Sequence, residues 1–221
     1  MPDNAENTIA ARRAQIISEI DAVSDNNVTL VAVSKRQPDE RLQAALDSGQ
    51  RVFGENRVQE ASEHWAARRA QYPDLELHLV GPLQTNKAEE AVALFDMIET
   101  LDRPKLAHAL RRSMDAARRE VPCLIQVNTG DEPQKSGVSV GELDALLATA
   151  TEACKLDVRG LMCIPPVNEP AGPHFALLAT LAGARNLPVL SMGMSGDYLL
   201  AARLGATHVR IGSALFGARE G

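Results

Sequence analysis

The chain has 221 residues, of which 45% are hydrophobic and only 3% aromatic, so we expect one globular domain over residues 1–221 with an aliphatic core. Its net charge of -6 at pH 7 excludes the basic surface that nucleic-acid binding requires. The N-terminal residues lack the apolar segment of a signal peptide, and no apolar run reaches membrane-spanning length, so we expect a cytoplasmic protein without a membrane partner. The three cysteines form no CxxC pair and the five histidines no paired spacing, which predicts neither a disulfide scaffold nor a metal site.

Short aliphatic runs alternate with longer helical patterns along the whole chain. We predict strands at 28–34, 51–54, 76–80, 96–100, 122–128, 157–163, 188–192 and 207–211. Helices are expected at 4–24, before the first strand, and then at 39–48, 57–70, 86–93, 103–119, 140–154, 173–184 and 197–204, with a short one near 213. The expected helix ends carry first-turn prolines, N-caps and closing glycines: Pro38 and Pro104, Asp102 and Ser139, and Gly49 and Gly205.

Eight strands alternating with helices in a chain of this length predict an α/β fold, a single-domain (β/α)8 TIM barrel. A doubly wound open sheet is the alternative. It is disfavoured because Lys35-Arg36-Gln37-Pro38 follows the first predicted strand, where such a fold carries a GxGxxG turn. The turn-rich stretch 165–173 is typical of a loop at the barrel mouth.

Lys35 ends the first predicted strand. Alternation puts Val31, Val33 and Lys35 on one face, so the ammonium follows two apolar side chains towards the interior. A desolvated lysine at the mouth of a barrel can attack a carbonyl and form an imine. The alternative is a solvated lysine just past the strand end.

Two later segments indicate an anion site. Ser195 lies between Gly193 and Gly196 just before one predicted helix, and Gly212-Ser213 opens the next. Glycine backbone and serine hydroxyls at two helix N-termini predict phosphate binding, and barrels commonly hold phosphate after strands seven and eight. Alternatively, the glycines serve tight turns and the serines are simple N-caps.

Arg210 alternates with Val209 and Ile211, and we expect its side chain to face inward just before the phosphate loop. An inward guanidinium needs a partner, which is either a heteroaromatic ring nitrogen or a neighbouring carboxylate. An imine-forming lysine, a phosphate site and a donor to a ring nitrogen together describe pyridoxal 5′-phosphate, which carries an aldehyde, a phosphate and a pyridine nitrogen.

Seven segments resemble the pyridoxal-phosphate homeostasis protein family, in family order: VAVSK at 31–35, FGEN at 53–56, GPLQTNK at 81–87, QKSG at 134–137, GLMCIPP at 160–166, LSMGMSGD at 190–197 and VRIGSALFG at 209–217. The resemblance implies a barrel like the N-terminal domain of bacterial alanine racemase, with Lys35 holding the cofactor as an internal aldimine. By matching positions it implies the remaining contacts, namely Ser195, Gly212 and Ser213 to phosphate, Arg210 to the pyridine nitrogen, Asn56 near the ring hydroxyl, and Ile164 and Met194 against the ring.

The departures from the family pattern are modest. The family often has an aromatic residue beside the histidine of the third strand, where this chain reads Leu77-His78-Leu79, and a threonine or alanine is common at the position of Cys163. We expect these departures to affect only the rim of the pocket.

A catalytic role would require a second base and a strong electron sink. A racemase needs two bases, and in the alanine racemase arrangement the second is a tyrosine from a further domain, which we expect to be absent here. The only tyrosines, Tyr72 and Tyr198, are expected at a helix end and a helix start. A protonated Arg210 disfavours protonation of the ring nitrogen, which leaves the cofactor a weaker electron sink.

We therefore expect a non-catalytic pyridoxal-phosphate binding protein that acts in vitamin B6 homeostasis, hands the cofactor to apoenzymes and is a monomer. The alternatives are a small pyridoxal-phosphate racemase or lyase, and a Schiff-base aldolase that uses Lys35 without a cofactor. Lys87 and Lys135 are expected on mouth-side loops as solvated lysines, with a second phosphate site as the alternative.

Overall fold

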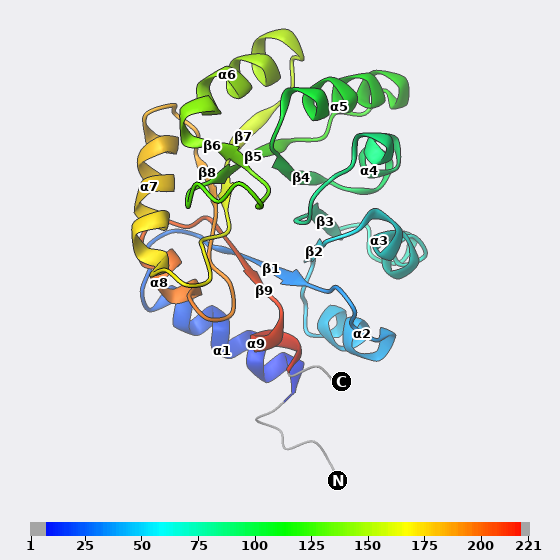
Figure 1. Ribbon diagram of the computed structural model, residues 1–221. Helices are drawn as coiled ribbons and strands as arrows, with labels where there is room; N and C mark the ends of the chain where they lie inside the picture. Colours follow the sequence, from blue (N-terminus) through cyan, green and yellow to red (C-terminus); the bar gives the residue numbers. More distant parts are fainter. Residues whose placement is uncertain (1–7, 218–221) are drawn as a thin grey trace.

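The computed structural model describes residues 8–217, which form a closed barrel of parallel strands with helices around it (Figure 1). The barrel strands are β1 (Thr29–Val33), β2 (Val52–Glu55), β3 (Glu76–Leu79), β4 (Met97–Leu101), β5 (Cys123–Asn128), β7 (Val158–Cys163), β8 (Val189–Ser191) and β9 (His208–Ile211). Each pairs in parallel with its neighbour, β9 pairs with β1, and the β4–β5 pairing completes the ring. The predicted (β/α)8 barrel is confirmed, and the open-sheet alternative is wrong because the sheet closes.

The helices that follow the strands are α2 (Asp39–Asp47), α3 (Val58–Trp65), α4 (Ala88–Leu94), α5 (Pro104–Ala117), α6 (Leu143–Ala148), α7 (Ala171–Gly183), α8 (Tyr198–Arg203) and α9 (Ser213–Phe216). Helix α1 (Ile9–Asp21) precedes β1, and the start of the predicted helix 4–24 and both ends of the predicted domain 1–221 lie outside the described residues. Two predicted helices are composite: α3 is followed by the 3-10 turn η2 (Arg68–Ala70), and α6 lies between the 3-10 turn η4 (Val140–Glu142) and the π-helical turn η5 (Thr149–Ala153). A third 3-10 turn, η3 (Thr85–Lys87), leads into α4.

One strand was not predicted. The two residues of β6 (Val138–Ser139) pair with the end of β5, with Val138 opposite Val127. A strand this short shows no periodicity in the sequence, and only the pairing with a neighbouring strand defines it.

Most helix ends agree with the sequence prediction. Gly49 and Gly205 have φ of +86° and +94° and end α2 and α8, as predicted for left-handed closing residues. Pro104 is the first residue of α5, whereas Pro38 is the N-cap of α2 and not part of its first turn.

Of the two predicted N-cap residues, the structure confirms the position of Ser139 and not that of Asp102, and neither side chain caps a helix. Arg103 and not Asp102 is the N-cap residue of α5, and the Asp102 carboxylate accepts a hydrogen bond of 2.5 Å from Arg103 instead. Ser139 is the N-cap residue of η4, but its hydroxyl donates to the Glu142 carboxylate at 2.7 Å and not to the helix backbone. In both cases a charged side chain nearby offers a stronger partner than the helix backbone.

The main apolar core lies between the barrel and its surrounding helices. It includes Phe53 and Trp65, whose ring centroids are 4.3 Å apart with the rings tilted by 41°. The inside of the barrel holds a second, smaller cluster of Met97, Leu124 and Met162. Branched aliphatic side chains usually fill such interiors, but here buried charged and polar side chains share the space, namely His78, Glu99, Ser191 and Arg210.

Helix α1 lies beside α9 (Figure 1). Arg12 Nε donates to the Leu215 carbonyl at 2.6 Å, so the N-terminal helix holds the turn that begins at Gly212. No helix in the part of the chain that the structure describes is both long enough and apolar enough to cross a membrane.

Candidate functional site

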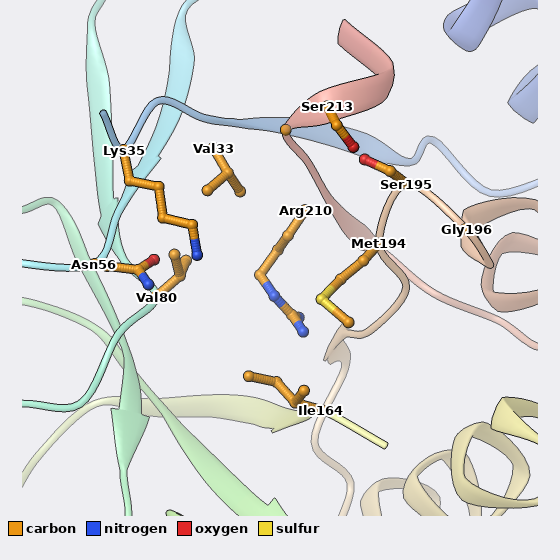
Figure 2. Close-up of a pocket in the computed structure, with 11 residues that line it drawn as sticks. Val33, Lys35, Asn56, Val80, Ile164, Met194, Ser195, Gly196, Arg210 and Ser213 are labelled. Carbon is orange, nitrogen blue, oxygen red and sulfur yellow. The ribbon is translucent and has the colours of Figure 1, made fainter. Parts of the chain in front are cut away.

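A cavity of about 310 Å³ lies at the C-terminal ends of the barrel strands (Figure 2). The structure brings all eight predicted site residues to its wall: Lys35, Asn56, Ile164, Met194, Ser195, Arg210, Gly212 and Ser213. Val33, Val80 and Gly196 also line it. Gly196 belongs to the predicted anion site, whereas Val33 and Val80 were not predicted as site residues. The volume is in the lower part of the range for small-molecule and cofactor sites.

Lys35 follows the end of β1 and is partly buried. Its side chain points into the cavity from the side opposite the serines (Figure 2). Both of its chain neighbours are fixed by carboxylates: the Ser34 hydroxyl donates to Glu55 at 2.7 Å, and the Arg36 N–H donates to Glu60. Arg36 has a φ of +57°, so the chain turns sharply just after the lysine. These contacts fix the direction in which Lys35 leaves the strand.

The Glu55 carboxylate is fully buried beneath this turn. Its Oε1 atom accepts from Ser34 Oγ, from His64 Nδ1 at 2.8 Å and from Trp65 Nε1 at 3.0 Å. The hydrogen bond to Glu55 raises the pKa of His64, and this outweighs the opposite effect of its burial. Glu55 therefore joins helix α3 to the loop that carries Lys35.

Glu55, Glu60 and His64 are also the one group of three possible metal ligands within residues 8–217, with ligand atoms within 4.8 Å of one another. The hydrogen bonds of Glu55 and Glu60 to the residues on either side of Lys35 account for the cluster without a cation. The absence of a metal stays a prediction.

Ser195 and Ser213 direct their hydroxyls towards each other at the opposite end of the cavity (Figure 2). The Ser195 hydroxyl also accepts from the Ala214 N–H at 3.2 Å, so one hydrogen bond joins the loop that follows β8 to the first turn of α9. Asp197 is the N-cap residue of α8, and Gly212 is that of α9. Ser195 therefore does not act as a simple N-cap of α8, which the sequence had left open.

The turn before Ser195 depends on Gly193. Its φ is +92°, and its carbonyl accepts from the Arg210 N–H at 3.0 Å. A Cβ at this position would lie 2.5 Å from that of Ala201. Glycine therefore permits both the left-handed backbone and the close approach of α8.

Arg210 is almost completely buried, with 4% of its surface exposed, and its guanidinium lies apart from both Lys35 and the serines, on the side of Ile164 (Figure 2). Nη1 donates to the Ser191 hydroxyl at 2.7 Å and Nη2 to the Cys163 carbonyl at 2.8 Å. These bonds use two of its five N–H groups. No carboxylate of the described residues lies within ion-pair distance of Arg210, so the direct ion pair left open by the sequence is not formed.

Cys163 is buried, and burial raises the pKa of its thiol to about 12. The thiol is therefore protonated at neutral pH and unreactive. This residue affects the site through its backbone carbonyl beneath Arg210, and not at the pocket rim as the sequence suggested.

Comparison with known proteins finds matches over nearly the whole chain. A family model described as the alanine racemase N-terminal domain matches residues 12–220. The pyridoxal phosphate homeostasis protein of Escherichia coli is 38% identical over 231 residues, which cover 97% of this chain and 98% of that protein. The chain belongs to the pyridoxal phosphate homeostasis protein family. The family resemblance drawn from its seven motifs is confirmed.

Solved structures agree with this family. The family member PipY from Synechococcus elongatus, solved with PLP bound, superposes with a TM-score of 0.85 at 38% identity and covers 95% of this chain and 100% of that one. An alanine racemase from Clostridium difficile has a TM-score of 0.72 at 11% identity, over 93% of this chain and 56% of that chain. The racemase therefore shares the fold. An identity of 11% supports no statement beyond the fold.

Two lysines that the family motifs include lie away from the cavity wall. Lys87 pairs with Glu90 at 2.8 Å, and Lys135 pairs with Glu132 at 2.7 Å. Both ammonium groups thus have a carboxylate partner on a neighbouring turn, which favours the interpretation as solvated lysines over a second phosphate site.

Proposed function

We propose that this protein binds pyridoxal 5′-phosphate and acts in vitamin B6 homeostasis without catalysing a reaction of its own. The observation that carries the proposal is that one cavity presents three groups at three separate places: the amine of Lys35, the guanidinium of Arg210, and the hydroxyls of Ser195 and Ser213. Pyridoxal 5′-phosphate likewise carries an aldehyde, a pyridine nitrogen and a phosphate at three separate positions of one ring. The related PipY protein, solved with PLP bound, and the name of the Escherichia coli relative support the same ligand.

The residues present fit this cofactor. Lys35 would hold its aldehyde carbon covalently, and the hydroxyls of Ser195 and Ser213 with the Gly212 backbone would bind its phosphate. Asn56 would lie near the ring hydroxyl. The faces of the ring would contact apolar side chains that line the cavity, namely Val33, Val80, Ile164 and Met194.

Arg210 favours binding over catalysis. When bound, the cofactor supplies an electron sink for amino-acid chemistry, and the sink is strongest when the ring nitrogen is protonated. Arginine stays protonated in proteins, so Arg210 would donate to the ring nitrogen of a bound cofactor and would disfavour a proton there.

The tyrosines offer no second base at the cavity. Tyr72 Oη bonds with Gln43 Nε2 at 2.8 Å, and the Tyr198 hydroxyl donates to Glu19. Among the described residues that line the cavity, Lys35 is the one side chain suited to act as a base. Racemisation needs a base on each face, so this arrangement supports a carrier.

The open mouth of the cavity supports release of the cofactor. Ile164 and Met194 are 38% and 37% exposed, although both line the cavity. We propose that the protein hands the cofactor to apoenzymes as a monomer in the cytoplasm. Reactivation of an apoenzyme faster than by free cofactor at the same concentration would support transfer, and light scattering of the loaded protein would give the oligomeric state.

The test of binding is a visible spectrum of the purified protein with added cofactor, before and after borohydride, followed by peptide mass mapping. We expect a yellow band that disappears on reduction and a pyridoxyl mass on Lys35, with Lys87 as the unlabelled internal control. Absence of the band, or a label on another residue, would contradict the proposal. Turnover of an amino acid well above the rate of free cofactor would instead identify a racemase or lyase.

A further inference from the structure

Glu99 lies on β4, and its carboxylate is fully buried inside the barrel. Its Oε1 atom lies 2.7 Å from His78 Nδ1, and its Oε2 atom accepts from the Ser191 hydroxyl at 2.5 Å. Neither Glu99 nor Ser191 lines the cavity, yet the Ser191 hydroxyl is the side-chain acceptor for Arg210, beside the Cys163 carbonyl.

The Glu99 carboxylate is ionised. Burial alone would raise its pKa, but the hydrogen bond from His78 and the charges of His78 and Arg210 lower it to about 2. Burial likewise opposes the charge of His78, but its hydrogen bonds to Glu76 and Glu99 outweigh this effect and raise its pKa to about 9. His78 is therefore an imidazolium at neutral pH, with both nitrogens donating to carboxylates.

The ionised carboxylate fixes the direction of the hydrogen bonds. A carboxylate only accepts, so the Ser191 hydroxyl has to donate to Glu99 and accept from Arg210 with its lone pair. Charge assistance strengthens both bonds. The Cys163 carbonyl accepts from the other Nη atom of Arg210, so both terminal nitrogens of the guanidinium are held, on a side chain that lines the cavity.

Stability alone does not explain this buried set of charges. Replacing buried ion pairs with apolar side chains of similar volume is often neutral or stabilising. The same interior holds an apolar cluster of Met97, Leu124 and Met162, so the fold accommodates apolar packing here. The chain of polar contacts leads from His78 through Glu99 and Ser191 to Arg210, and Arg210 alone of these four residues lines the cavity.

We propose that Glu99, acting through Ser191, is a positioning residue that holds the Arg210 guanidinium towards the ring nitrogen of the bound cofactor. The inference rests on the proposed function, because it concerns the same cavity. Its consequence is that the electronic state of the cofactor depends on a carboxylate that does not touch it.

The test measures the NMR resonance of the ring nitrogen directly. The cofactor carries nitrogen-15 in its ring and is bound to the full-length protein. In the wild type we expect the resonance of an unprotonated, hydrogen-bonded nitrogen. In Ser191→Ala and in Glu99→Gln we expect this resonance to move and the cofactor to dissociate about tenfold faster, since a hydrogen bond to a charged group is weakened. The double variant should be no worse than the worse single variant, because the two residues act in series.

Glu63→Gln is the control for a Glu-to-Gln change. Glu63 is exposed on α3 and bonds to Gln59, so its replacement leaves the contacts and charges of His78, Glu99, Ser191 and Arg210 in place. We expect a wild-type resonance. Ser191→Ala removes only one oxygen atom. It therefore tests the positioning of Arg210 even if Glu99→Gln does not fold.

The outcomes separate the two proposals. A wild type that binds no cofactor would overturn the proposed function. A wild type that binds it, with a ring-nitrogen resonance unchanged in Ser191→Ala, would overturn the positioning role alone. A lower melting temperature with an unchanged resonance would show that Glu99 and Ser191 serve stability only.

Discussion

Lys35 and Ser195 line one cavity from opposite ends, on the loops that follow β1 and β8 (Figure 2). Different parts of the fold hold the two ends: Glu55 and Glu60 fix the lysine turn, whereas Ala214 on α9 bonds to the serine. A ligand that carries both an aldehyde and a phosphate would engage both ends. The affinity contributed by each end can therefore be measured separately.

Ser195→Ala is expected to weaken binding of pyridoxal 5′-phosphate about ten- to a hundredfold, because one hydrogen bond to a charged group contributes about 1.5–3 kcal/mol. Binding of pyridoxal, which lacks the phosphate, should not change. Spectrophotometric titration with both ligands measures the two effects. Ser139→Ala is the control, since the Ser139 hydroxyl bonds to Glu142 away from the cavity. Equal losses for both ligands would rule out a phosphate contact.

Gly81→Ala is expected to lower both stability and cofactor affinity. A Cβ at Gly81 would lie 2.3 Å from the Asn56 carbonyl oxygen and 2.6 Å from its Cα, so the backbone that carries Asn56 would have to move. Overpacking of this kind costs about 1–3 kcal/mol in the free energy of unfolding. Gly141→Ala is the matched control, because its Cβ meets no atom within 4 Å. Urea unfolding and cofactor titration of both variants check this, and equal stability of the two would contradict it.

Glu55→Gln is expected to lower the pKa of His64. The hydrogen bond to the Glu55 carboxylate is the main reason that this pKa is raised, and a neutral amide removes most of the attraction. Titration of the imidazole by NMR measures the effect. Glu63→Gln serves as the control, since Glu63 is exposed and bonds to Gln59 on the helix surface. If His64 titrates alike in both variants, Glu55 does not set its charge.

The fold and the cavity wall could be predicted because both follow from regular patterns. Aliphatic runs of strand length alternate with amphipathic helices, and the C-terminal ends of parallel strands meet on one face of a barrel. Lys35, Ser195 and Gly212 stand just after their strands, so their convergence follows from the topology. Val80 occupies the same kind of position after β3, and that position is the signal that could have identified it.

The buried charges beneath the cavity could not be paired from the sequence. Glu99 and Ser191 are 92 positions apart; Glu99 shares the short strand β4 with the polar Thr100, and Ser191 is the single polar residue of β8. The sequence assigned His78 no role in the site, but the structure buries it inside the barrel against Glu99, because its alternation with Leu77 and Leu79 turns it inward. Charged residues at inward positions of buried strands are rare. The presence of His78 and Glu99 at such positions is the sequence signal that could have identified them.

The ion pair between His78 and Glu99 makes stability depend on pH. The pKa of His78 is raised from 6.5 to about 9 in the folded protein, so its contribution is complete below pH 6.5 and is lost as the pH rises through 9. The pKa of Glu99 is lowered from 4.5 to about 2, so its contribution is complete above pH 4.5 and is lost as the pH falls through 2. Both contributions are therefore complete between pH 4.5 and 6.5.

We expect the free energy of unfolding to fall by up to about 3 kcal/mol between pH 6 and 9.5, since each unit of pKa shift corresponds to about 1.4 kcal/mol. Urea unfolding at the two pH values measures this decline. In Glu99→Gln the decline should be clearly smaller, because the imidazolium loses its buried partner and the pKa of His78 falls. A decline of the same size in both proteins would show that groups other than this pair cause the pH dependence.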